Sequence, residues 1–135
     1  MAVIVGILLT IMVQSSSITT STLVPLAGAG LLSLRQVYPI TLGANIGTTV
    51  TALLASMAVD GDTAMVARQI ALVHLLFNLS GILIWYVPQT LREIPLRMAE
   101  WMAEFATRSK RWAVAYVFGV FYGLPAGIFF LSELF

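Results

Sequence analysis

Long apolar runs dominate the chain, and two of them are interrupted by clusters of hydroxyl and amide side chains. The first apolar run covers residues 1–32, and its polar cluster covers residues 14–22. No charged residue precedes Arg35. About 20 residues cross the hydrocarbon core of a membrane, so this run is too long for one ordinary span. Polar groups at that depth must bond within the protein or face a cavity. The pattern therefore predicts a broken helix or a helical hairpin.

Pro25 leaves a second interpretation of this segment open. Proline has no N–H, so the Ser21 carbonyl four residues earlier loses its helical partner. This freed carbonyl lies within the polar cluster and supports a break in the helix. The alternative is one proline-kinked helix whose hydroxyls bond their own backbone, because serine and threonine side chains often do so.

The second polar cluster lies in residues 36–59, which we expect to form another interrupted segment. Residues 32–38 read as a short connection, and Pro39 is expected in the first turn of the following helix, where proline is tolerated. Gly43 and Gly47 are four residues apart, a spacing typical of close helix packing in membranes. The cluster is also rich in side-chain oxygens, so packing and ligand binding both remain possible roles. These oxygens belong to Thr41, Asn45, Thr48, Thr49 and Thr51.

Residues 66–87 predict a clear spanning helix that ends at Pro88. His74 and Asn78 are four residues apart and share one face of this helix. Such a pair is more typical of packing between helices than of a proton relay.

Two further helices are predicted in the C-terminal third. Residues 95–108 form an amphipathic helix in the membrane interface, with Pro95 in its first turn. Its apolar stripe consists of Met98, Trp101, Met102 and Phe105. Residues 112–135 form the last span, which Pro125 is expected to kink. Its small-residue face, expected to pack, consists of Gly119, Gly123 and Gly127.

Composition places these helices in a membrane. Of the 135 residues, 59% are hydrophobic and 10% are charged, whereas soluble domains carry about 25% charged residues. We therefore expect an all-α, multi-pass integral membrane protein of the cell membrane, with lipid as a partner. Residues 89–111 hold five of the seven basic residues, so this stretch is expected on the cytoplasmic side and loop 59–64 on the opposite side. Nothing indicates a nucleic-acid partner.

The two polar clusters have the chemistry of an ion site. Hydroxyl, amide and freed backbone oxygens suit a monovalent cation, whereas N–H groups at helix N-termini suit an anion. Neither cluster contains an acidic residue, which argues against a divalent metal and a carboxylate proton relay. Many transporters build their sites from discontinuous helices of this kind. An enzyme is not expected, because Ser15 to Ser17 have no adjacent base and the single histidine lies in mid-helix.

Three stretches carry a resemblance to a known family. They are QSSS at 14–17, YPITLGANIGTT at 38–49 and FNLSGIL at 77–83. Together they resemble the second repeat of the type II sodium-dependent phosphate cotransporters, from about residue 8 to at least 115. The resemblance implies a secondary transporter with two inverted repeats, each with a QSSS motif and broken or re-entrant helices. It implies symport of inorganic phosphate with Na⁺ as the coupling ion and with no other cofactor.

The resemblance also implies the residues of the site. The expected sodium ligands are Gln14, Ser15, Thr48 and Thr51. The expected phosphate contacts are Ser16, Ser17 and Asn45. Ala44 departs from the animal relatives, which tend to have serine there, so one hydroxyl ligand is expected to be missing.

Residues 1–135 contain only one QSSS motif and are expected to be a single transmembrane repeat unit. We expect a fragment of a longer transporter, because the N-terminus begins inside an apolar segment. The partner that completes the site is then the missing first repeat, or else a second copy of the chain. Two alternatives remain for the function. One is sodium-coupled transport of sulfate or a dicarboxylate, and the other is a non-transporting interaction or regulatory subunit.

Overall fold

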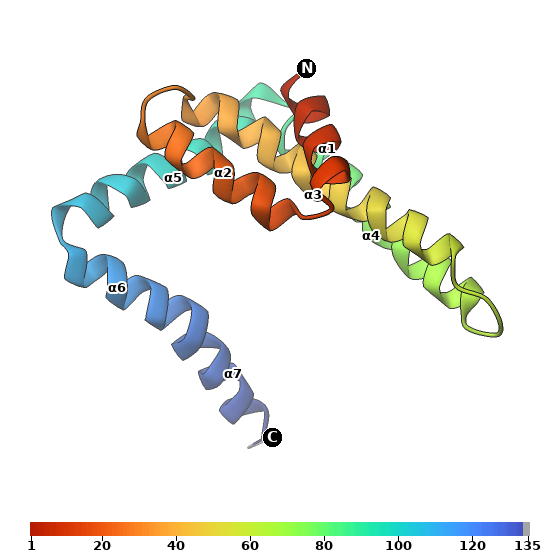
Figure 1. Cartoon of the computed structure of the whole chain (residues 1–135). Coiled ribbons are helices and arrows are strands. Elements are labelled where there is room, and N and C mark those ends of the chain that lie inside the picture. The colour runs from red at the N-terminus through yellow and green to blue at the C-terminus, as the bar shows by residue number, and fades with distance from the viewer. Residues whose placement is uncertain (134–135) are drawn as a thin grey trace. The chain divides into compact units, whose positions relative to one another are not determined.

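The computed structural model describes residues 1–133, and these residues form helices joined by short turns (Figure 1). The chain divides into two compact units, Met1–Leu96 and Arg97–Phe135. Each unit has its own internal packing. The first unit contains α1 to α4 and the beginning of α5.

The QSSS motif separates two short helices, α1 (Ala2–Val13) and α2 (Ser16–Gly28). Gln14 adopts the left-handed conformation, with φ 56° and ψ 25°, and ends α1. Ser15 is extended and caps α2, since its side chain accepts a hydrogen bond from the Ile18 N–H at 3.3 Å. The helix therefore breaks at these two residues. Pro25 lies inside α2 and does not end it.

Helix α3 (Leu34–Met57) is unbroken, so the interruption expected in residues 36–59 is not found. The helix also begins five residues before Pro39, and residues 34–38 belong to it rather than to a connection. The Gln36 side chain stabilises this start, because its oxygen accepts from the N–H and the hydroxyl of Ser33, each at 2.9 Å. The threonines do not interrupt the helix because their hydroxyls donate to its own carbonyls, as Thr48 does to Ala44.

Helices α1 and α3 cross with their backbones nearly in contact. A Cβ atom at Gly43 would lie 2.0 Å from the Val3 carbonyl oxygen, and one at Gly6 would lie 2.0 Å from the Ile40 carbonyl oxygen. A Cβ at Gly47 would lie 2.7 Å from Cβ of Thr10. The packing role of the two α3 glycines is therefore confirmed, since only residues without a side chain allow this approach.

The centre of this unit contains threonine as well as apolar residues. Thr10, Ala44 and Thr49 are each 0% exposed. The Thr10 hydroxyl donates to the Thr19 hydroxyl at 3.0 Å, and the Thr19 hydroxyl donates to the Ser15 carbonyl at 3.1 Å. This chain of hydrogen bonds joins α1 to α2 just beyond the break. It satisfies buried hydroxyls that would otherwise be costly in an apolar setting.

Helix α4 (Ala64–Trp85) returns beside α3 after a short turn. It lies two residues earlier in the sequence than the predicted span 66–87. Helix α5 (Gln89–Arg108) begins six residues before the predicted residue 95, so Pro95 lies inside the helix and not in its first turn. In its first turn the Arg92 N–H donates to the Pro88 carbonyl at 3.0 Å.

The second unit contains the rest of α5, then α6 (Lys110–Phe118), a π-helical turn η1 (Gly119–Gly123) and α7 (Leu124–Ser132). The wide turn ends just before Pro125, whose ring would clash with the carbonyl four residues earlier in a regular helix. The structure has a π-helical turn next to Pro125, and a kink of the last span at this residue stays a prediction. A Cβ at Gly119 or Gly127 would meet no atom within 4 Å among the described residues, so packing of this face stays a prediction. Residues 134 and 135 of the predicted last span lie outside the described residues.

Within residues 1–133, three helical segments are long and apolar enough to cross a membrane: Leu34–Met57, Ala64–Trp85 and Lys110–Ser132. Helix α1 is apolar but has only 12 residues, fewer than the roughly 20 needed for a span. With a mean hydropathy of +0.96, the chain is an integral membrane protein, and its described residues form helices and turns only.

Candidate functional site

An open groove of about 490 Å³ lies where the α1–α2 break faces α3. Gln14 lines it from the break, and Thr48 and Thr51 line it from α3. The two threonines are three residues apart and therefore share one face of the helix. The structure thus brings together three of the four predicted sodium ligands. The remaining lining residues are apolar: Ile11, Ala52, Leu54 and Ala55.

The backbone conformation of Gln14 marks the break as a specialised position. Gln14 is the one non-glycine residue with positive φ among residues 1–133. Such a conformation is uncommon for a residue with a Cβ and tends to persist where the surrounding structure enforces it. The last four carbonyls of a helix lack helical N–H partners, and this end carries the negative pole of the helix dipole. Ile11 and Gln14 therefore place a cation-favouring helix end at the groove.

The hydroxyls of Thr48 and Thr51 are oriented by the backbone of α3. Thr48 donates to the Ala44 carbonyl at 3.1 Å, and Thr51 donates to the Thr48 carbonyl at 2.8 Å. A hydroxyl that donates its proton retains lone pairs on its oxygen. Both side chains are half-buried and line the groove. They can therefore present acceptor oxygens, which suit a cation.

The N-terminus of α2 has the opposite character. The N–H groups of its first turn lack helical carbonyl partners, although the Ser15 side chain accepts the one of Ile18, and the positive end of the dipole favours an anion. Ser16 and Ser17 form its first turn, and Ser17 lines a second open pocket of about 460 Å³. Only Gln14 and Ser15 separate this end from the C-terminal end of α1. A cation-favouring and an anion-favouring helix end thus lie two residues apart.

The other predicted site residues do not line the groove. The Ser15 hydroxyl caps α2. Ser16 and Ser17 lie on the α2 side of the break, and Asn45 is exposed on α3 one turn before Thr48. Ala44 is fully buried beside Gly6. It belongs to the α1–α3 contact, so a missing hydroxyl at this position does not remove a ligand from the groove.

The apolar lining was missed because alanine, leucine and isoleucine carry no chemical signal of their own. Helical spacing could have identified two of these residues, since Ala52 and Ala55 lie one and two turns beyond Thr48 on the same face.

The hydrogen bond between His74 and Asn78 does not join their side chains, because the Asn78 amide donates to the His74 backbone carbonyl at 3.2 Å. Among residues 1–133, no three histidine or carboxylate side chains gather to hold a metal ion.

Comparison with known proteins extends this picture. Residues 1–107 match the model of a family described as Na⁺/Pi-cotransporter. The chain is 43% identical over 132 residues to the sodium-dependent phosphate transport protein 2B of Bos taurus, covering 98% of this chain and 19% of that protein. It is 44% identical to protein 2C of Rattus norvegicus, covering 98% of this chain and 22% of that protein. It is 45% identical to protein 2A of Ovis aries, covering 97% and 20%.

The chain spans about a fifth of the length of the curated relatives it matches. No solved structure matches it.

Proposed function

Because this chain belongs to the Na⁺/Pi-cotransporter family, we propose that it supplies half of the site of a sodium-coupled symporter of inorganic phosphate in the cell membrane. The convergence of Gln14, Thr48 and Thr51 on one groove supports this proposal most directly. These residues come from two separate parts of the sequence. All three supply neutral oxygens, and Na⁺ is bound by oxygen ligands.

Sodium binds at the groove in this proposal. Gln14, Thr48 and Thr51 supply side-chain oxygens, and Ser15 adds oxygen from the break itself. The C-terminal end of α1 contributes its free carbonyls and the negative end of its dipole. A cation held this way is stabilised without any carboxylate.

Phosphate binds on the other side of the break, at the N-terminus of α2. Ser16 and Ser17 donate hydrogen bonds from their hydroxyls, and Asn45 approaches from α3. The nearby Na⁺ offsets part of the phosphate charge, which couples the binding of the two ions. Discontinuous helices commonly serve substrate and coupling ion together in this manner.

A second repeat completes the site. It is either another segment of a longer chain or a second copy of this one, arranged as an inverted repeat around the broken helices. The transport activity therefore belongs to the complete, multi-pass assembly.

The test is uptake of radiolabelled phosphate by the complete transporter in proteoliposomes, with an inward Na⁺ or K⁺ gradient. Gln14→Gly is the informative variant, because glycine adopts positive φ readily and only the amide is lost. Loss of one polar ligand costs about 1–3 kcal/mol, and each 1.4 kcal/mol is tenfold in binding. The Na⁺ concentration for half-maximal uptake should therefore rise about tenfold or more.

Other results would redirect the proposal. Equal uptake with Na⁺ and K⁺ would reject sodium coupling. Sodium-driven uptake of sulfate or succinate that phosphate does not inhibit would identify another anion as the substrate. Unchanged uptake by Gln14→Gly would fit a chain that has no part in the ion site.

A further inference from the structure

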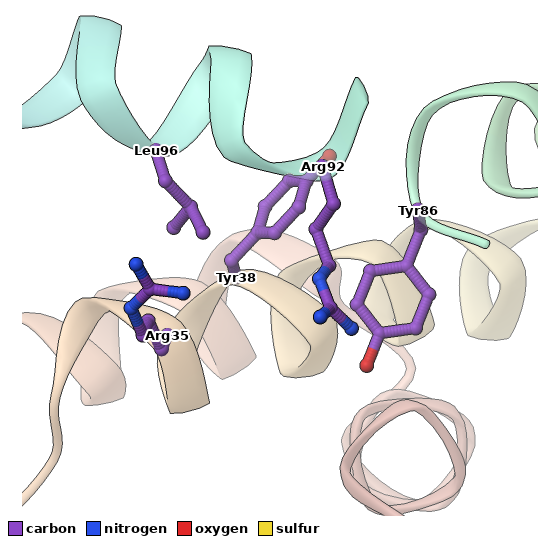
Figure 2. A pocket seen from close by; sticks show the side chains of 5 residues that line it. All are labelled: Arg35, Tyr38, Tyr86, Arg92 and Leu96. Atoms are coloured by element: carbon purple, nitrogen blue, oxygen red, sulfur yellow. The ribbon is translucent and has the colours of Figure 1, made fainter. Parts of the chain in front are cut away.

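A second kind of pocket lies at the other end of the first unit, where α3 begins, α4 ends and α5 begins. Figure 2 shows its five lining residues, which are Arg35, Tyr38, Tyr86, Arg92 and Leu96. Its volume is about 170 Å³, and it shares no residue with the groove at Gln14. The pocket combines two guanidinium groups with two phenol rings, a set that none of the transport steps above uses.

One of the two arginines is already paired. Arg35 forms a two-pronged ion pair with Glu93, with N–O distances of 2.5 and 2.7 Å. The pair joins the start of α3 to α5 and holds the pocket walls together. Two guanidinium groups and one carboxylate leave one net positive charge beside the pocket.

Arg92 carries that remaining charge. Its guanidinium carbon lies 5.5 Å from the centre of the Tyr86 ring, and the Tyr86 ring meets the Tyr38 ring edge to face at 5.9 Å. A guanidinium stacked on a ring keeps its N–H groups directed outward in its own plane. Within residues 1–133, no hydrogen bond or ion pair of the Arg92 side chain is found. Its donors are therefore available to a ligand.

The position of the pocket in the membrane follows from the α3–α4 hairpin. The two helices are candidate spans joined by a short turn at residues 58–63, so the start of α3 and the end of α4 lie on the same side. Tyr86 directly follows α4 and has the amphipathic character of residues found at membrane interfaces. The pocket thus lies at the depth of lipid headgroups.

We propose that this pocket binds the phosphoryl group of an anionic lipid headgroup, held mainly by the guanidinium of Arg92. A phosphodiester carries one negative charge, which matches the one net positive charge of the pocket. Arginine presents paired N–H groups that fit phosphate oxygens. Leu96, 4% exposed, and the two tyrosine rings provide apolar contact for the glycerol part of a lipid. Free phosphate has the same oxyanion chemistry, but it has no apolar part that could contact Leu96 and the tyrosine rings.

The experiment measures binding of dioctanoyl phosphatidylglycerol to the purified chain in non-ionic detergent by titration calorimetry. Arg92→Gln removes the charge and keeps most of the side-chain length, so affinity should fall about tenfold or more. Arg97→Gln is the matched control, because it makes the same charge change on α5 outside the pocket. It should change affinity by less than about threefold, as expected for an exposed charge. Circular dichroism establishes that both variants keep their helical content.

Three further arms test the assignment. Dioctanoylglycerol, which lacks the phosphoryl group, should not bind, and inorganic phosphate should bind much more weakly than the lipid. Arg92→Lys keeps the positive charge but loses the planar guanidinium group, so its affinity for the lipid should lie between those of wild type and Arg92→Gln. Equal losses in Arg92→Gln and Arg97→Gln would overturn the pocket in favour of general surface charge. Inorganic phosphate binding as tightly as the lipid would overturn the lipid assignment.

Discussion

Thr41 and Thr48 occupy nearly the same local setting on α3. Each donates its hydroxyl to the carbonyl four residues earlier at 3.1 Å, and each is partly buried. Only Thr48 lines the groove with Gln14. The local hydrogen bond is therefore an ordinary helical feature. The position of the hydroxyl relative to the break distinguishes a candidate ligand from a structural threonine.

The difference between Thr41 and Thr48 leads to a prediction about the sodium site. Thr48→Val keeps the shape of the side chain and deletes the hydroxyl oxygen. The Na⁺ concentration for half-maximal phosphate uptake should rise about tenfold, because an unmade polar contact costs on the order of 1–3 kcal/mol. Thr41→Val deletes the same group two turns earlier and should leave the sodium dependence unchanged. Uptake by the complete transporter in proteoliposomes, measured against Na⁺ concentration, provides the comparison.

The contrast between the two variants decides the interpretation. If both shift the sodium dependence equally, the effect comes from weakening α3 and not from loss of a ligand. If neither shifts it, Thr48 is not a sodium ligand.

At the scale of elements, the close crossing of α1 and α3 places the break opposite the threonines. Gly43 lies against the backbone of α1, where a Cβ would approach the Val3 carbonyl oxygen to 2.0 Å. Backbone cannot move aside as a flexible side chain can. Any side chain at this position must therefore push the two helices apart, and Gln14 would move away from Thr48.

Gly43→Ala should accordingly destabilise the protein. Overpacking typically costs about 1–3 kcal/mol, which lowers the unfolding temperature by several degrees. Gly81→Ala is the matched control, because Gly81 lies inside α4 and a Cβ there meets nothing within 4 Å. That variant should unfold at the wild-type temperature or slightly above it, since alanine favours helix over glycine. Thermal unfolding in detergent gives both values. A Gly43→Ala protein as stable as Gly81→Ala would show that the helices separate without cost.

At the scale of the whole molecule, the α3–α4 hairpin makes membrane orientation testable within one unit. The turn at residues 58–63 and the start of α5 lie at opposite ends of these two candidate spans. From the basic residues of 89–111 and the positive-inside rule, we predict that the start of α5 lies on the cytoplasmic side. In that orientation we expect Asp62 on the outer side of the membrane and Thr90 on the cytoplasmic side.

Single cysteines test this orientation because the chain has none of its own. In intact cells, a membrane-impermeant thiol reagent should label Asp62→Cys and leave Thr90→Cys unlabelled. Permeabilised cells should show labelling at both positions, which controls for the reactivity of each thiol. Labelling of Thr90→Cys alone in intact cells would reverse the orientation.

Much of this protein is determined by local sequence. Apolar composition places it in a membrane, since too few charges are present to cover a soluble surface. The QSSS motif indicates a candidate site, because hydroxyl and amide groups at membrane depth need partners or a cavity. Gln14, Thr48 and Thr51 were identified in this way, by residue type and by resemblance, and the structure shows them around one groove.

Tertiary structure alone decided which polar residues meet. Asn45 and Thr48 are alike in polarity and lie one turn apart, yet only Thr48 lines the groove. The face of α3 that meets the break depends on where α1 crosses it, and contacts between Gly6, Gly43 and their opposing backbones determine that crossing. These contacts join residues more than 30 positions apart. Hydropathy and helical periodicity describe only neighbours along the chain. They located the two polar clusters and the resemblance singled out residues within them, but neither could give the arrangement of those residues around the groove.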